Sequence, residues 1–233
     1  DIRSERLEFG YGPFSQPSAI DSYQRLALGF ATVNLAASER ITANHKGSLA
    51  VYQSQGEYRA GSGYAYSGGD LNLITPLLTG EAGSRNSLLA GGALRVSAGG
   101  GGAASTPVEL ANGALGAELA LEGASLLLDT RVGLPSGKLS LTAQEDLELG
   151  AGAQLDLAGR ALRFDDVIRY SWGGEVNLLS HGGNIRQAGA SRIDLSASNN
   201  QAGSLTAVAL DSAAGVVDLQ GQILAASSGE YDA

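Results

Sequence analysis

Pairs of leucines recur at a fixed interval of eight residues between Gly137 and Gly159. Small or charged residues separate these pairs, which are Leu139/Leu141, Leu147/Leu149 and Leu155/Leu157. Two side chains at positions i and i+2 lie on the same face of a β-strand, whereas a step of eight fits neither an α-helix nor a two-residue hairpin. The sequence therefore predicts short strands, each followed by a turn of the chain.

The same interval returns in two other parts of the chain. Val33, Ile41 and Leu49 stand eight residues apart, and Ile193 follows Ile185 at the same step. Further strand-like segments with alternating apolar residues lie at 68–74, 92–98, 117–123, 203–210 and 215–225. Because no segment has the apolar stripe of an amphipathic helix, we expect an all-β chain.

Three such strands with their turns make a repeat of roughly 20–25 residues, the size of one coil in a stacked β-solenoid. In a parallel β-helix each apolar pair points inward and stacks on its equivalent in the next coil, while small or turn-forming residues occupy the corners. We therefore predict a parallel β-helix. The side chains expected to point inward are Leu139, Leu147, Leu155, Val176, Ile185 and Ile193.

The alternative all-β fold is an antiparallel sandwich with about eight to twelve residues per strand and turn. That fold favours Asn-Gly or Asp-Gly dipeptides as two-residue turns between strands. No such dipeptide directly joins two of the strand-like segments above, so the parallel arrangement is preferred.

Two kinds of segment interrupt the repeat. Residues 1–30 lack it and contain several aromatic residues and prolines, so we expect a cap or irregular lead-in before a repeat region at 31–233. Loop insertions are expected near 52–69, 97–105 and 163–174. The first is rich in tyrosine, the second is a low-complexity Gly/Ala tract, and the third carries the single tryptophan, Trp172.

Charge and composition exclude several classes of partner. The 233 residues carry a formal net charge of −9, which argues against nucleic acid or an anionic membrane as the ligand, because both are polyanions. The chain has no cysteine and no methionine, so we expect an aliphatic core without disulfides, in an excised or processed piece of a longer protein. No long apolar run is present, and we expect no membrane insertion.

Catalytic and metal-binding motifs are weak. Neither His45 nor His181 has a second histidine at metal-ligand spacing, and GxSxG, Walker and GGxGxD motifs are absent. We expect no enzyme activity, no metal and no cofactor. The alternative is a carbohydrate-active β-helix, either a polysaccharide lyase or a glycan-binding module. A lyase could draw on Arg163, Asp165, Asp166 and Arg169, although adjacent acids on a strand point to opposite faces.

Tyrosines supply the candidate binding residues. Tyr58, Tyr64 and Tyr66, with Tyr52 close by, could stack on sugar rings or pack on a protein, because tyrosine combines a flat apolar ring with a hydroxyl. Tyr64 and Tyr66 share a face if their segment is extended. The other interpretation is that these rings only cover the side or an end of the stack.

Several segments resemble the repeat region of filamentous-haemagglutinin-type large exoproteins, the secreted partners of Gram-negative two-partner secretion systems. The resemblance covers roughly residues 31–225 and is carried by VNLAASERITANHKGSLAVY, GGDLNLITPLLTGEAGS, GGALRVSA, GKLSLTAQEDLELGAGAQLDLAG and GEVNLLSHGGNIRQAGASRIDLSAS. The amino-terminal secretion domain of that family, often marked by an Asn-Pro-Asn-type motif, is absent from this sequence, as is a carboxy-terminal toxin module.

The resemblance implies a right-handed parallel β-helix and a secreted or bacterial cell-surface location. It also implies that an outer-membrane barrel transporter exports the full-length parent protein. The expected function is a structural or adhesive module, a stiff scaffold in cell adhesion or biofilm cohesion. Its expected partner is a host or bacterial surface glycan or protein.

Overall fold

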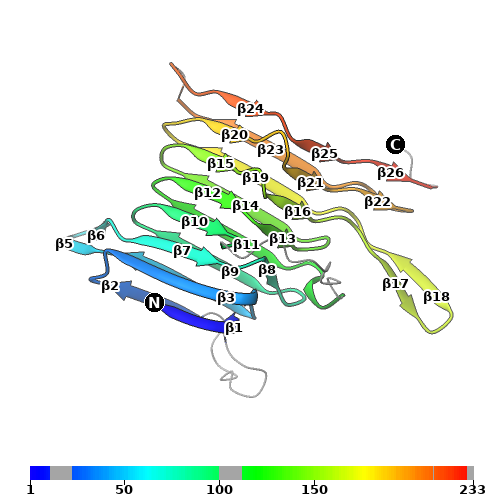
Figure 1. Cartoon of the computed structure of the whole chain (residues 1–233), viewed down its shortest axis with the longest axis horizontal. Helices are drawn as coiled ribbons and strands as arrows, with labels where there is room; N and C mark the ends of the chain where they lie inside the picture. Colours follow the sequence, from blue (N-terminus) through cyan, green and yellow to red (C-terminus); the bar gives the residue numbers. More distant parts are fainter. Residues whose placement is uncertain (11–22, 100–111, 212, 230–233) are drawn as a thin grey trace.

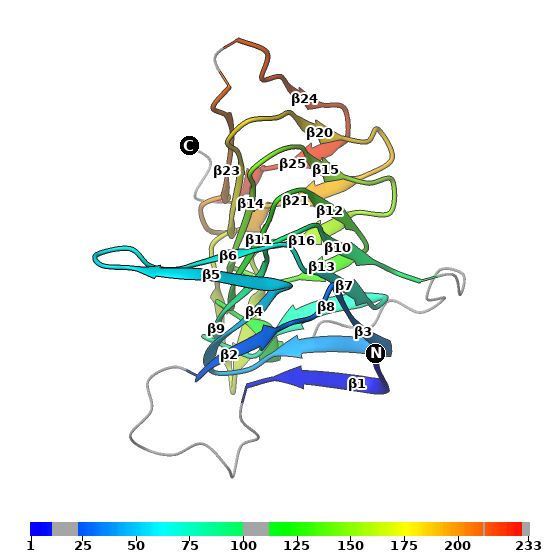
Figure 2. The ribbon, with the colours of Figure 1, turned by 90° about the vertical axis from the view of Figure 1, so that its left-hand side faces the viewer.

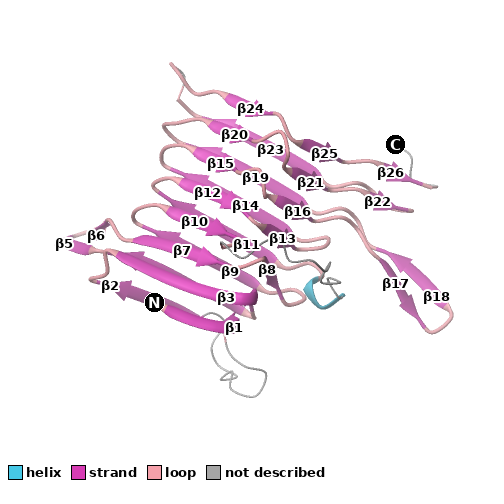
Figure 3. Cartoon of the chain, viewed as in Figure 1, coloured by secondary structure: helices cyan, strands magenta, loops and turns pink. Residues whose placement is uncertain are grey.

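The computed structural model describes residues 1–10, 23–99, 112–211 and 213–229. The regular structure in this part of the chain is all β-strand apart from one short 3-10 turn, η1 (Asn112–Ala114) (Figure 3). None of its helical segments is long and apolar enough to cross a membrane.

Most strands stack in parallel along three faces (Figure 1). The first face contains the first half of β3 (Thr32–Ala43), then β7 (Asp70–Ile74), β10 (Leu94–Ser97), β12 (Leu126–Asp129), β15 (Leu147–Leu149), β20 (Ile185–Gln187) and β24 (Val217–Leu219). The second face contains the last residues of β3, then β8 (Leu77–Gly80), β13 (Arg131–Gly133), β16 (Gln154–Asp156), β21 (Arg192–Asp194) and β25 (Gln222–Leu224). The third face contains β2 (Tyr23–Leu28), β4 (Lys46–Tyr52), β9 (Arg85–Ala90), β11 (Glu118–Gly123), β14 (Lys138–Ala143), β19 (Glu175–Ser180) and β23 (Ser204–Ala209).

Two further strand pairs are parallel: one involves β3, and the other forms a separate two-stranded sheet. β1 (Ile2–Phe9) runs parallel to β3 along its length, and β22 (Ala197–Ser198) pairs in parallel with β26 (Ser227–Ser228). We call one turn of the chain through the faces a passage. Every described pair of strands from successive passages is parallel, so the antiparallel sandwich is wrong.

The register shows the repeat that the sequence predicted. Glu118 pairs with Lys138, and Arg131 pairs with Gln154, so the shortest passages through the faces take 20 to 23 residues. Between β10 and η1 the described chain forms no strand on the second face, where β8 pairs directly with β13. The apolar residues therefore stay in register from passage to passage, although the passages differ in length: Glu175 pairs with Ser204 after 29 residues, and Arg85 pairs with Glu118 after 33.

The core is an aliphatic column enclosed by the three faces. The six side chains predicted to point inward, Leu139, Leu147, Leu155, Val176, Ile185 and Ile193, are all buried, which confirms the prediction. Equivalent residues stack on one another: Leu147, for example, lies in register between Leu126 and Ile185. Burial of each large aliphatic side chain contributes about 1.5–3 kcal/mol, which compensates for the scarcity of aromatic residues.

Threonines satisfy the backbone where the first face turns into the second. Thr75 Oγ1 donates a hydrogen bond of 2.9 Å to the Leu77 carbonyl, and Thr130 Oγ1 donates one of 2.6 Å to the Thr75 carbonyl. Both side chains are buried, so these bonds spare the corner the cost of unpaired polar groups.

Two antiparallel hairpins leave the stack on opposite sides (Figure 1). β5 (Ser54–Arg59) and β6 (Gly63–Ser67) form one inside the insertion expected at 52–69, and β17 (Ala161–Phe164) and β18 (Val167–Tyr170) form the other, starting two residues before the expected 163–174. Of the expected insertion at 97–105, residues 100–105 lie outside the described part. So do residues 11–22 of the expected lead-in at 1–30, whose other residues include β1 and β2.

Candidate functional site

The tyrosine-rich insertion forms the β5–β6 hairpin, which projects from the corner between the third and first faces (Figure 2). Tyr58 lies opposite Tyr64, and Gln55 lies opposite Tyr66, with an irregularity in register between the two pairs. The hydroxyls of Ser54 and Ser67 are 2.8 Å apart across the base of the hairpin.

Four rings form a continuous series, which we call the tyrosine row: Tyr52, Tyr66, Tyr64 and Tyr58. Tyr52 and Tyr66 are stacked, with ring centroids 4.7 Å apart. Tyr64 lies 6.5 Å from Tyr66, and Tyr58 meets Tyr64 edge-on at 5.3 Å. Tyr64 and Tyr66 share one face of an extended strand, as their spacing predicted.

The inner end of the tyrosine row is fixed to the stack. Tyr52 is half-buried, and a Cβ added to Gly91 would lie 2.6 Å from its ring, so only glycine allows the ring to pack there. The Gln53 amide lies 3.1 Å from both the Ser67 and the Gly68 carbonyl oxygens and closes the hairpin base. Burial, reinforced by the charge of Glu122, raises the pKa of the Tyr52 hydroxyl, which therefore remains a hydrogen-bond donor at neutral pH.

Exposure increases toward the outer end of the row. The exposed fraction is 37% for Tyr66, 48% for Tyr64 and 63% for Tyr58. An isolated two-stranded hairpin is only marginally stable, and each ring pair adds about 0.5–1.5 kcal/mol, so the rings also support the hairpin. The row presents flat apolar surface and hydroxyls to solvent on a support fixed at one end.

The charged residues considered for a lyase lie on the other hairpin, β17–β18. Asp165 and Asp166 lie within the insertion expected at 163–174 and form the two-residue turn of this hairpin, with Asp165 at a φ of 48°. Short polar side chains tolerate that left-handed conformation, which explains an acid at this position. Arg163 Nε donates to the Asp165 carbonyl at 3.1 Å, and all four charged side chains are exposed.

The histidines lie apart from both hairpins. His45 occupies a corner with a φ of 51°, and His181 lies in an exposed bend. In the part of the chain that the structure describes, no three His, Cys, Asp or Glu residues are grouped so that they could hold a metal ion.

The sequence did not predict a pocket beside Trp172, at the corner where the second face turns into the third. Its lining includes Gly137, Gly174 and Gly203, which immediately precede β14, β19 and β23. The strand register shows that these three glycines occupy equivalent positions in successive passages. Their spacing along the chain does not show it, because the β17–β18 hairpin lies between the first two. The composition alone could not identify them.

Comparison with known proteins adds no relative: no protein-family model, no curated protein and no solved structure matches this chain. Its function is therefore argued from its own geometry.

Proposed function

We propose that this chain is a segment of a right-handed parallel β-helix from a secreted, filamentous-haemagglutinin-type exoprotein. In this proposal it is a stiff scaffold for adhesion or biofilm cohesion and not an enzyme. The full-length parent would reach the cell surface or medium through an outer-membrane barrel transporter.

The observation that supports this proposal most is the continuity of the parallel register. Seven strands follow one another on the third face, and each of the five between β2 and β23 bonds the strand of the passage before and that of the passage after. Parallel strand connections in one sheet are overwhelmingly right-handed, which favours that hand for the coil. A column in which every passage bonds its neighbours resists bending, and this suits a spacer between a cell and its target.

The absence of enzyme activity in this proposal has its own support. Asp165 and Asp166 sit at the exposed tip of a hairpin, whereas Arg163 and Arg169 lie on its two strands. General acid–base chemistry requires groups held close to the same reacting atom.

The tyrosine row is the proposed contact with a surface glycan or protein. It combines three exposed aromatic rings with a rigid inner end at Tyr52. Exposed aromatic residues on a fixed support lose little conformational entropy on binding, which is why tyrosine is common in binding surfaces.

Beads coated with the purified chain test this proposal on cultured bacterial and host cells. Replacing Tyr58, Tyr64 and Tyr66 together by alanine is expected to abolish attachment, because the row provides the contact. The matched control replaces Arg163, Asp165, Asp166 and Arg169 by alanine on the other hairpin, and attachment is expected to persist. Attachment that survives the tyrosine replacements in a protein of unchanged circular dichroism would assign these rings a structural role only.

A further inference from the structure

The pocket beside Trp172 includes residues that follow the β17–β18 hairpin, and this hairpin leaves the stack on the side opposite the β5–β6 hairpin that carries the tyrosine row (Figure 1). Its volume is about 450 Å³, within the range of small-molecule sites. Residues from four successive passages line it, among them Glu118, Lys138, Glu175, Ser204 and Trp172. We call it the tryptophan pocket.

Backbone packing keeps this corner free of side chains. The amides of Glu175 and Ser204 donate to the carbonyls of Gly137 and Gly174, at 2.8 and 3.0 Å. A Cβ on Gly174 would lie 2.5 Å from the Gly137 carbonyl oxygen, and one on Gly203 would clash with the Gly174 carbonyl oxygen. Glycine is therefore required at these corners, and no side chain from them fills the pocket.

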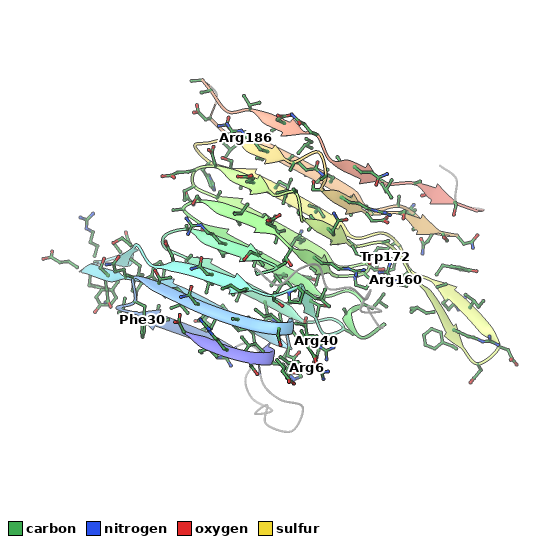
Figure 4. The ribbon with its side chains drawn as sticks, viewed as in Figure 1. Arg6, Phe30, Arg40, Arg160, Trp172 and Arg186 are labelled. Carbon is green, nitrogen blue, oxygen red and sulfur yellow. The ribbon has the colours of Figure 1, made fainter. Side chains whose placement is uncertain are left out.

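The backbone around Trp172 is fixed although its ring is exposed. Ser136 Oγ donates to the Trp172 carbonyl at 2.7 Å and lies 2.7 Å from Ser171 Oγ. Ser171 Oγ in turn accepts a hydrogen bond from the backbone amide of Arg160, whose Nη2 donates to both carboxylate oxygens of Asp156 in a half-buried ion pair. Figure 4 shows Trp172 next to Arg160 at the base of the β17–β18 hairpin.

The Trp172 side chain is 62% exposed despite this support. It is the single tryptophan of the chain. A large aromatic ring held by a rigid backbone and left in solvent beside a pocket is suited to stacking on the apolar face of a flat ligand.

The polar groups of the pocket point to hydroxyl recognition. Lys138 Nζ and Asn177 Nδ2 both donate to Glu175 Oε1, at 2.9 and 2.6 Å. These hydrogen bonds, that from Asn177 first, lower the pKa of Glu175, so its carboxylate is ionised at neutral pH. Its other oxygen, Oε2, accepts no hydrogen bond from the residues that the structure describes, and it is open to a donor.

The charge of the lining limits the ligand further. Glu118 and Glu175 outweigh Lys138, which gives the lining a net charge of −1 in a chain of net charge −9. An acidic ligand would be repelled, and a purely apolar one would leave the carboxylate without its water.

We propose that the tryptophan pocket binds a neutral pyranose unit of a glycan. The sugar ring stacks on the Trp172 indole, one hydroxyl donates to Glu175 Oε2, and the Gln201 amide and Ser204 hydroxyl are within the same lining for further hydrogen bonds. This site is distinct from the tyrosine row, and it does not depend on the adhesive function proposed above.

The single tryptophan makes the test direct, because intrinsic indole fluorescence reports on this pocket alone. We would titrate the whole chain with maltotriose, cellotriose and triacetylchitotriose, and with trigalacturonate as the acidic comparison. At about 10 mM sugar a ligand with a Kd of about 1 mM occupies about nine-tenths of the sites. The expected result is a saturable shift in emission and protection from acrylamide quenching with at least one neutral trisaccharide, and no change with trigalacturonate.

Two variants locate the binding. Glu175→Gln keeps the side-chain shape but weakens the acceptor, and we expect affinity for the bound trisaccharide to fall about tenfold, in line with the cost of a charge-assisted hydrogen bond. The matched control is Glu148→Gln, an exposed glutamate on β15 of the first face, which should leave the affinity unchanged. No saturable shift with any neutral sugar, equal binding of trigalacturonate, or equal affinity in Glu175→Gln and Glu148→Gln would each overturn the proposal.

Discussion

Replacing Leu147 by alanine tests the inward assignment that underlies the whole fold. Leu147 has no exposed surface and lies in register between Leu126 and Ile185 in the aliphatic column. Leucine-to-alanine changes at such positions cost about 2–5 kcal/mol, which includes the lost transfer energy and the cavity left behind. A column with backbone bonded on both sides cannot easily collapse around the cavity, so we expect a value in the upper half of that range.

The neighbouring residue provides the control. Glu148 follows Leu147 on the same strand but points to solvent, and its replacement by alanine is expected to change stability by no more than about 0.5 kcal/mol. The comparison holds the strand, the passage and the type of substitution constant. Only the face of the strand differs.

Thermal unfolding followed by circular dichroism measures the difference. For a chain of this size 1 kcal/mol corresponds to about 2–4 °C in Tm, so Leu147→Ala should lower Tm by about 7–20 °C and Glu148→Ala by about 2 °C at most. Amide hydrogen exchange in β12, β15 and β20 should increase locally if the chain unfolds passage by passage. Equal Tm values for the two variants would refute the inward assignment of Leu147 and the stacked core with it.

Two further predictions concern polar groups. Gln187 is buried in register between Leu149 and Leu219, and neither polar atom of its side chain has a hydrogen-bond partner in the described protein. Gln187→Leu should therefore raise the free energy of unfolding, measured in urea, by about 1–3 kcal/mol. A lower free energy of unfolding would show that the amide is hydrogen-bonded in solution. Hydrogen bonds, chiefly from the Asn184 backbone amide, lower the pKa of Asp146, so its contribution is present above about pH 4 and is lost as the pH falls through the folded-state pKa. Asp146→Asn should therefore make the acid loss of stability below pH 4 shallower, and an identical pH profile would contradict this linkage.

Local pattern allowed much of the fold to be predicted. The i and i+2 spacing of leucines fixes which side chains share a strand face, and the eight-residue step fixes where the chain must turn. Both depend only on backbone geometry over a few residues. The burial of Leu139, Val176 and Ile193 could therefore be predicted without knowing their neighbours.

The placement of Asp165 and Asp166 could not be predicted in the same way. Two consecutive acids fit a strand or a turn equally well by spacing, and the antiparallel pairing of Arg163 with Ile168 decides between them. The composition of that insertion indicated a departure from the stack but not a hairpin.

The arrangement of the tyrosine row could be predicted only in part. The shared face of Tyr64 and Tyr66 follows from their spacing, whereas the stacking of Tyr66 on Tyr52 requires the chain to fold back through the hairpin. Whether the row binds a partner stays a prediction, and the bead assay decides it.

The sequence by itself determined the strand periodicity, the inward residues and the aliphatic character of the core, because each follows from short-range alternation of side chains. Only the tertiary structure decided the tryptophan pocket, which needs Gly137, Gly174 and Gly203 stacked on one another beside Trp172. These residues are brought together by the parallel register of three passages, and one intervening hairpin breaks their spacing along the chain. A pocket that is formed by residues from several passages cannot be predicted from the residue spacing within one passage.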